Sequence, residues 1–553
     1  MDMLCTSKRM VIILNKMSKK NLMNWWLMAA VVLGISLSFT ACSDDDNNGT
    51  EQPSDVNEQT VNNKPREDSP ESFDIGSELS KLLNSNNGDE DSIYFFLEEA
   101  RKQGNMFTGK YYSCRYSYLS TTADGKPVWL TGRMAWPQSG KAEYIIGGCH
   151  ITMTDNLSCP SMSKSLTSDC GITCMLFASN ALVVFPDYEG YGNTLNRAHP
   201  YLYQEATARQ VIDGIVAARK QFLEQRGGTL KDDYKTIVVG YSQGGSVAMA
   251  THKYLEQGID GKAPLADDLH LAGSICGDGP YDPVATLKHY VTTNRLCMPV
   301  VAPLIIKGMC DANPYVAGEY NIEDYLCADF LNSGIVDLIS TKGFGTDDIQ
   351  ERLCDYSANH STSTGKYTVT DDDSVFVMYG FARESTGWFS SEDRGFMPIT
   401  AENNSRYTWR NNNGDRYATA GVVLRPEVRE FFAMENGWLS GGLGSIFYVP
   451  SPAMVAIYEA LEMNNLTTDW QPQRPMIVFH SKYDEVVPFV NYEQARDAFT
   501  GENFHGIIYD TNIQTHVSVG KSFFTLYLSS YVLDMRNGNA AKLPREKTVT
   551  GTW

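Results

Sequence analysis

A serine lies between two glycines in the segment Gly240-Tyr241-Ser242-Gln243-Gly244. A short strand-like run precedes this segment at 236–239, and a helix-like stretch follows it at 246–255. A tight strand-to-helix turn holds such a serine in a strained backbone conformation, and side chains at Gly240 and Gly244 would clash there. The sequence therefore predicts that the Ser242 hydroxyl is a nucleophile and that the Gln243 N–H faces a developing oxyanion. The alternative is an ordinary turn with tolerated glycines.

A serine hydroxyl needs a neighbouring base, and that base must be oriented by a carboxylate. With this type of turn, the chain order is serine, then acid, then histidine. Asp484 lies one short loop beyond a predicted strand at 475–479. His516 follows a predicted strand at 504–509 and begins the last predicted helix. We predict that Ser242, Asp484 and His516 form a catalytic triad.

Other residues compete for these roles. Glu485 is the alternative acid, although a first-turn helix acid favoured by the helix dipole is the better interpretation of it. We expect His505 to pack within its strand, and His516 itself could be a surface histidine. His150 and His480 lie at predicted strand ends, where they could line the pocket but are expected to be structural.

A second oxyanion donor is expected from the loop 149–155, which follows another predicted strand. Thr154 is the candidate in this loop, but the sequence alone does not fix the residue. Acyl transfer by these groups requires neither a metal ion nor an organic cofactor.

The chain contains twelve cysteines, and its N-terminal segment, described below, predicts export. Of the twelve, ten lie in the region expected to fold, where disulfide bonds are the default outside the cytosol. Two groups are close in sequence: Cys159, Cys170 and Cys174, and then Cys297, Cys310, Cys327 and Cys354. A zinc site is the alternative, but no histidine lies near either group at ligand spacing apart from His150.

Strand-like and helix-like patterns alternate along the chain. Strands are predicted at 128–136, 144–148, 181–185, 236–239, 475–479 and 506–509, and helices at 204–224, 246–255, 492–499 and 517–533. The continuous apolar run at 181–185 is typical of a strand buried on both faces. The alternation predicts an α/β fold with a mostly parallel sheet and helices on both faces.

Four features together resemble the secretory lipase family of α/β-hydrolases: the segment 186–192, the serine turn at 240–244, Asp484 and His516. The loop that ends at Thr154-Asp155 also resembles the oxyanion loop of that family. The resemblance covers about 108–280 and 471–537, and it implies a Ser-Asp-His lipase or esterase with a lid between its sixth and seventh strands.

A long insertion separates the serine from the acid. We predict an α/β-hydrolase core in two parts, 73–280 and 471–553, interrupted by a large cap or lid insertion at 281–470. The insertion contains several aromatic residues, which are expected to serve mainly core packing. They are Trp388, Phe389, Phe396, Trp409, Phe431, Phe432 and Trp438.

The N-terminus predicts export. Lysines precede an apolar run at 25–39, and small residues follow it, which is typical of a signal peptide at 1–41. Cys42 resembles the lipidated cysteine of a bacterial lipoprotein, and the acidic run after it resembles the surface-export signal of Bacteroidota lipoproteins. Residues 42–72 are poor in apolar residues and predict a flexible tether. We therefore expect a protein anchored by lipid to the outer membrane, at the cell surface.

Composition excludes some classes of protein. With 553 residues, 42% of them hydrophobic, and a net charge of −20, the chain can bury large cores but lacks the basic surface that nucleic acid requires. The expected partners are a small-molecule, glycan or lipid ester substrate and a membrane, with no nucleic acid. A serine peptidase, a polysaccharide acyl esterase on the same fold and a non-catalytic surface binding lipoprotein remain alternatives.

Overall fold

The computed structural model describes residues 64–65, 67–78, 109–360, 418–433, 450–510 and 516–550. The predicted signal peptide, Cys42 and the tether as far as residue 63 lie outside these residues. Residues 57–553 form one compact unit. Within the described ranges, no helix combines the length and the apolar character needed to cross a membrane.

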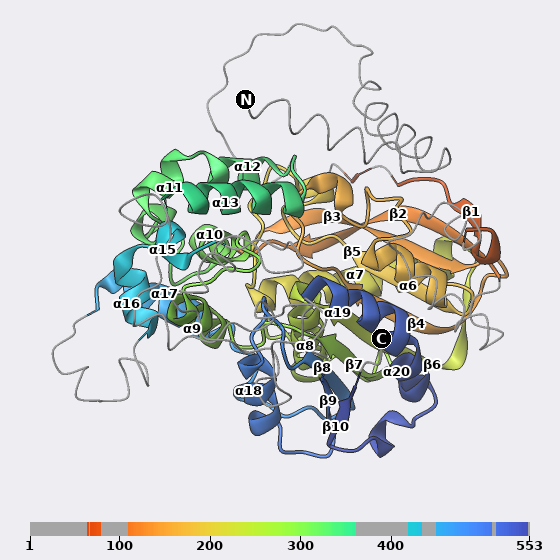
Figure 1. The fold of residues 1–553 in the computed structure, drawn as a ribbon. Helices are drawn as coiled ribbons and strands as arrows, with labels where there is room; N and C mark the ends of the chain where they lie inside the picture. The colour runs from red at the N-terminus through yellow and green to blue at the C-terminus, as the bar shows by residue number, and fades with distance from the viewer. Residues whose placement is uncertain are drawn as a thin grey trace, which may run out of the picture. The chain divides into compact units, whose positions relative to one another are not determined.

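The described residues form a ten-stranded sheet in the order β1-β2-β3-β5-β4-β6-β7-β8-β9-β10 (Figure 1). Strands β4 to β10 are parallel, whereas β1, β2 and β3 join one side of the sheet through antiparallel pairs. The strands are β1 (Glu71–Asp74), β2 (Lys110–Thr121), β3 (Pro127–Pro137), β4 (Lys141–Cys149), β5 (Ala181–Pro186), β6 (Thr229–Tyr241), β7 (Leu271–Gly277), β8 (Met476–Ser481), β9 (Phe504–Tyr509) and β10 (Glu546–Val549).

Helices cover both faces of this sheet, as the alternating pattern predicts. The helices of the core are α6 (Asp169–Phe177), α7 (Gln204–Gln225), α8 (Gln243–Gln257), α18 (Val490–Ala498), α19 (His516–Ser522) and α20 (Leu528–Arg536). A π-helical turn, η7 (Phe523–Tyr527), joins α19 to α20. The predicted helix at 517–533 is therefore interrupted by a π-helical segment.

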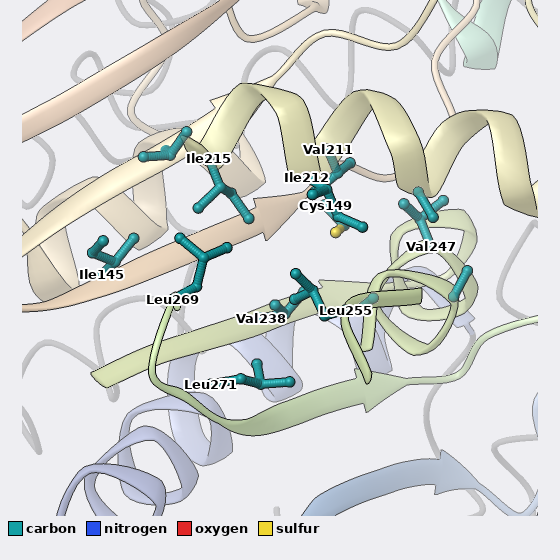
Figure 2. Packing of buried hydrophobic residues seen from close by; sticks show 14 of the residues in the cluster. Ile145, Cys149, Val211, Ile212, Ile215, Val238, Val247, Leu255, Leu269 and Leu271 are labelled. Carbon is teal, nitrogen blue, oxygen red and sulfur yellow. The ribbon is translucent and has the colours of Figure 1, made fainter. Parts of the chain in front are cut away.

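Two hydrophobic clusters fill the space between the sheet and its helices. On one face, Ile215 of α7, Val247 of α8 and Val238 of β6 belong to one buried cluster (Figure 2). On the other face, α6, η7 and α20 cover side chains such as Val239, the next residue of β6. Because successive strand residues point to opposite faces, a central strand contributes to both clusters. This explains the continuous apolar runs of β5 and β8, whose residues are all buried.

The folded region begins earlier than the predicted boundary at residue 73. Strand β1 starts at Glu71 and pairs with β2, and the Ser117 hydroxyl donates a hydrogen bond of 3.0 Å to Glu67. An edge strand is stabilised by backbone hydrogen bonds, so the polar composition of this segment does not prevent its pairing. The last residues of the predicted tether thus contact the core.

The insertion between β7 and β8 is helical where it is described. Its helices are α9 (Pro283–Thr293), α10 (Val301–Ala312), α11 (Ala328–Asn332), α12 (Ile335–Thr341), α13 (Thr346–His360), α15 (Ala420–Val423), α16 (Pro426–Ala433) and α17 (Pro452–Glu462). They share a hydrophobic cluster, to which the buried Phe431 and Phe432 belong, and which also includes Tyr201, Leu202, Val486 and Val487 of the core. The other five aromatic residues named above lie outside the described residues. We call this insertion the cap.

Candidate active site

Ser242 lies at the turn between β6 and α8, as the sequence predicts. Its φ is +57°, a left-handed conformation that residues other than glycine rarely adopt. A Cβ added to Gly240 would lie 2.1 Å from the Gly244 carbonyl oxygen, and one on Gly244 would lie 2.1 Å from the Cys149 carbonyl oxygen. The Ser242 N–H donates a hydrogen bond of 2.9 Å to the Gly277 carbonyl. Close backbone packing therefore fixes the strained serine.

The structure brings the three predicted triad residues together. His516 Nε2 lies 2.9 Å from Ser242 Oγ, and His516 Nδ1 lies 2.5 Å from Asp484 Oδ2. All three residues are buried, with exposed fractions of 7% for Ser242, 1% for Asp484 and 2% for His516. This arrangement can move a proton from the serine hydroxyl to the imidazole while the carboxylate holds the opposite ring nitrogen.

Asp484 is held as an ionised carboxylate. Its Oδ1 accepts hydrogen bonds of 2.8 Å from the backbone N–H groups of Val486 and Val487. Burial raises the pKa of Asp484. The charge and the hydrogen bond of His516, followed by the influence of the nearby His480, lower the pKa by more, so that it lies below its usual value. The acid can therefore stabilise an imidazolium at neutral pH.

Glu485 differs from its predicted position. Helix α18 begins only at Val490, so Glu485 is not an acid of its first turn. The Glu485 carboxylate instead accepts the backbone N–H of His516, with both oxygens at 3.0 Å. It thus interacts with the start of α19, a helix that is distant in sequence and near in space. The side chain of Asp484, rather than that of Glu485, contacts the imidazole.

Two residues that the sequence did not single out support this group. The Tyr241 hydroxyl donates a hydrogen bond of 2.8 Å to the His516 carbonyl, and its ring lies 5.1 Å from the imidazole. Asp278 follows β7 directly, is fully buried and lies beside Asp484. An acid at the carboxyl end of a strand indicates a possible site residue. Asp278 could be found in this way only if β7 were recognised first, and β7 has no clear apolar run in the sequence.

Gln243 begins α8, so its backbone N–H has no carbonyl partner within the helix. Its side-chain nitrogen lies 2.9 Å from His199 Nε2, and the side chain is buried. Burial lowers the pKa of His199 to about 3, so this histidine is neutral. The geometry therefore leaves the Gln243 N–H directed out of the helix N-terminus, next to Ser242.

The loop after β4 lies against the same turn, because a Cβ on Gly244 would also approach the His150 carbonyl oxygen at 2.9 Å. Thr154 in this loop is buried, and its hydroxyl donates a hydrogen bond of 2.8 Å to the Phe344 carbonyl in the cap. The Thr154 side chain is thus engaged with the cap. Asp169 of α6 accepts the Ile151 N–H at 2.9 Å and fixes the start of the loop.

The other histidines occupy structural positions. His150 stacks on Tyr188 at 3.7 Å between ring centroids, and its Nδ1 lies 2.8 Å from the Ile151 carbonyl. His480 is the second-to-last residue of β8 and is fully buried, with Nδ1 2.9 Å from the Ser481 carbonyl. Burial lowers the pKa of each to about 4. His505 packs within β9, as predicted.

A cavity of about 460 Å³ lies between the loop 191–199 and cap helices α10 and α12. His199 lines it and connects it to Gln243, whereas Ser242 does not line it. On the same side, the Lys342 ammonium donates to the carbonyls of Leu195 and Arg197. Cap and core therefore meet beside the turn that holds the serine.

The expectation of disulfide bonds is wrong for nine cysteines, which have free thiols. They are Cys114, Cys149, Cys159, Cys170, Cys174, Cys276, Cys297, Cys310 and Cys327. Proximity in sequence did not bring Cys159 to the other two: Cys159 packs with Met153 and Tyr191, whereas Cys170 and Cys174 are neighbours on α6 and face the sheet. They act as small apolar side chains. Within the described ranges, no group of three or more His, Cys, Asp or Glu side chains could hold a metal ion.

Comparisons with known proteins agree with this architecture. Residues 162–315, which include Ser242, match the model of the secretory lipase family. The structure is similar to the rice cell wall degrading esterase LipA from Xanthomonas oryzae, with a TM-score of 0.56, 18% identity, and coverage of 85% of this chain and 98% of that one. It is also similar to a putative hydrolase from Legionella pneumophila, with a TM-score of 0.55, 15% identity, and coverage of 84% and 97%. No curated protein sequence matches the chain. The chain has the α/β-hydrolase fold.

Proposed function

We propose that this chain is a serine hydrolase of carboxylic esters, a lipase or esterase that works through a Ser242–His516–Asp484 triad. The observation that supports this most directly is the chain of hydrogen bonds, 2.9 Å from Ser242 to His516 and 2.5 Å from His516 to Asp484. A binding protein has no physical need for a buried nucleophile, base and acid in this order. The family match across 162–315 supports the same reaction class.

In the first half of the reaction, His516 Nε2 accepts the Ser242 proton while Oγ attacks the ester carbonyl carbon. Asp484 holds the other ring nitrogen and stabilises the imidazolium that forms. The Gln243 N–H and a donor from the loop 149–155, with Thr154 as the candidate, bind the oxyanion. The imidazolium then protonates the alcohol as the C–O bond breaks, which leaves an acyl group on Ser242.

In the second half, a water molecule takes the place of the alcohol. His516 accepts a proton from this water, and the hydroxide formed attacks the acyl carbonyl carbon. The tetrahedral intermediate collapses, Ser242 regains its proton from His516, and the carboxylic acid leaves. Every proton transfer in this cycle involves a residue of the chain or the substrate, so the scheme uses no metal ion or organic cofactor.

An active-site-directed fluorophosphonate tests the nucleophile. The probe should label the wild-type protein and should fail to label Ser242→Ala. Ser246→Ala is a matched control on the same helix, because Ser246 is fully buried and donates a hydrogen bond of 2.8 Å to the Gln243 carbonyl. Labelling that survives Ser242→Ala, in a protein that keeps its cooperative unfolding, would exclude the proposed nucleophile.

A substrate panel then separates the alternatives. It contains short- and long-chain acyl esters, acylglycerols, acetylated xylan and aminoacyl amides. Acetylated xylan is included because the similar fold of LipA belongs to an esterase described as degrading the rice cell wall. Hydrolysis of amides without hydrolysis of esters would favour a serine peptidase. A folded protein that hydrolyses none of them and resists the probe would favour a surface binding lipoprotein.

Export and lipid anchoring belong to the same proposal. The secretory lipase match supports an exported protein. Cys42 is the proposed lipidated residue, and the part of the predicted tether that precedes the core contact at Glu67 is the proposed link to the outer membrane. Metabolic labelling with a clickable fatty acid, lost in Cys42→Ser, tests the anchor separately from the chemistry.

A further inference from the structure

Asp278 is a second carboxyl group beside the acid of the triad. Strands β7 and β8 are parallel neighbours with Gly277 opposite Phe479, so the residues that follow them meet at one edge of the sheet. Asp278 follows β7 directly and Asp484 follows β8 by a short loop. Asp278 is 0% exposed and Asp484 1%, and their side chains are hydrogen-bonded to each other.

The backbone holds Asp278 in this position at an energetic cost. Its φ is +38°, in the left-handed region, and its N–H continues the β7–β8 pairing with a hydrogen bond of 2.8 Å to the Phe479 carbonyl. Strained residues of this kind concentrate at functional sites. The strain directs the Asp278 side chain towards Asp484 and away from solvent.

A hydrogen bond between two carboxyl groups requires a proton on one of them. Asp484 accepts two backbone N–H groups and the imidazole, which favour its ionised form. Asp278 Oδ1 accepts the Ser481 N–H at 2.7 Å and lies 3.2 Å from His480 Nδ1. The Tyr241 hydroxyl also lies beside the Asp278 carboxyl, but it donates its proton to the His516 carbonyl, which leaves Oδ2 without a donor among the described residues. The proton therefore belongs on Asp278 Oδ2.

The other ionisable groups near the pair leave few charges. Burial lowers the pKa of His289 on α9 and of His480 to about 4, so both are neutral. Burial also raises the pKa values of Tyr241, Tyr281, Tyr290 and Cys297, which stay protonated. Glu485 and His516 also lie near the pair, and Arg295 is a buried cation close to Cys297. Burial together with the Asp484 charge raises the pKa of Asp278 well above its usual value.

We propose that Asp278 is a positioning residue that keeps its proton and donates it in a hydrogen bond to Asp484, which fixes the carboxylate against His516. The inference rests on the proposed function, because it concerns how the triad is oriented. A neutral donor holds the acid in place without adding a negative charge that would make His516 too basic. Ionisation of Asp278 would place two carboxylates side by side and weaken this arrangement.

Two substitutions separate this role from simple packing. Asp278→Asn keeps a donor towards Asp484 and an acceptor for the Ser481 N–H, whereas Asp278→Ala removes both. We expect Asp278→Ala to lower kcat by about 10- to 100-fold, with KM changed by about twofold or less, because a hydrogen bond to a charged group is lost. Asp278→Asn should restore kcat to within about threefold of wild type, since the donor is restored. Asp282→Asn is the matched control, a buried acid that caps α9 and accepts the Ala285 N–H at 2.9 Å.

The decisive measurements are the pH profile of kcat/KM for a p-nitrophenyl ester and the infrared difference spectrum between wild type and Asp278→Asn at neutral pH. We expect the acid limb of the profile, which reports His516, to stay in place in Asp278→Asn, and a protonated-carboxyl band to disappear. An acid limb shifted by about one pH unit or more to lower pH would show that Asp278 is ionised and overturn the proposal. Unchanged kcat in folded Asp278→Ala, with only lower stability, would overturn it as well. If the wild type hydrolyses no ester, the proposed function fails, while the infrared band still shows which residue holds the proton.

Discussion

The residues around Ser242 and the helices of the cap are positioned by different means. Ser242 is fixed by its own N–H bond to Gly277 and by glycines that let backbone segments approach closely. Asp484 is held by two backbone N–H groups of its loop. The cap is instead positioned by side chains. Its hydrophobic cluster includes Tyr201, Leu202, Val486 and Val487 of the core, and near the site polar side chains such as Thr154 and Lys342 bond to carbonyl groups.

This difference indicates where precision is needed. Backbone contacts at the carboxyl ends of parallel strands leave a nucleophile, base and acid little freedom to move. Side-chain contacts between cap and core can form or break without disturbing the sheet. We therefore expect substitutions in the two regions to have distinct signatures: loss of kcat in the core, and changes of stability or KM in the cap.

The strongest test of this comparison is His516→Ala against Thr346→Val. His516→Ala removes the base and should lower kcat/KM by about 10³- to 10⁴-fold. The Thr346 hydroxyl of the cap accepts a long hydrogen bond of 3.3 Å from the Thr154 hydroxyl, so Thr346→Val should change kcat by about threefold or less. Steady-state kinetics on one ester substrate checks both. Similar losses of kcat in the two variants would remove the distinction.

Two glycines sharpen the comparison through stability. Gly244→Ala in the core places a Cβ 2.1 Å from a carbonyl oxygen, so the backbone must move. We expect a loss of about 3–5 kcal/mol in the free energy of unfolding and a large loss of activity. Gly334 directly precedes α12 of the cap, with φ +76° and open space around it, so Gly334→Ala should cost only about 1 kcal/mol and preserve kcat. Denaturant unfolding measures both values, and equal costs would contradict the comparison.

The difference between local backbone geometry and long-range side-chain packing also determines what the sequence could predict. The motif at Ser242 and the short apolar strands β5, β6 and β8 are local patterns, and the chain order of acid and histidine follows from the topology. Strands β2 and β7 were not predicted, because β2 is rich in polar residues and tyrosine and β7 contains two glycines. Asp278 was missed together with β7, since its significance depends on which strand is its neighbour.

Other features depend on contacts that are distant in sequence. Glu485 bonds to the start of α19, which no local pattern indicates. The predicted compartment and the spacing of the cysteines favoured disulfide bonds, but most of these residues are buried on separate elements. Even Cys170 and Cys174, which are neighbours on α6, keep free thiols. In the insertion, the stretch 341–373 does not resemble a known lipase lid. Sequence reasoning therefore succeeded where backbone geometry is local, and failed where tertiary packing decides.

Lys342 provides a pH-dependent test of the contact between cap and core. Burial, followed by the charge of Lys307, lowers the pKa of Lys342 to about 8 in the folded protein, against an ordinary value of 10.5. Between these values the unfolded chain binds more protons than the folded one, so this lysine makes stability rise with pH. Relative to Lys342→Met, the wild-type free energy of unfolding should therefore increase from pH 8 to 10.5. Lys231→Met, at an exposed position, is the control, and its free energy of unfolding should depend on pH in the same way as that of the wild type. A constant difference between wild type and Lys342→Met across this window would show that Lys342 is not buried against the core.

The smallest expected effect distinguishes the two neighbouring acids. In Glu485→Gln an amide oxygen can still accept the His516 N–H, so only the added strength of a charged acceptor is lost. We expect a loss of about 0.5–1 kcal/mol in stability and at most about a threefold loss of kcat. Asp484→Asn instead forces the wrong imidazole tautomer and should lower kcat by about 10⁴-fold. If Glu485→Gln lost as much activity as Asp484→Asn, the hydrogen bond to the His516 backbone would matter as much as the carboxylate that contacts its ring. Glu485 and Asp484 would then act together as the acid of the site.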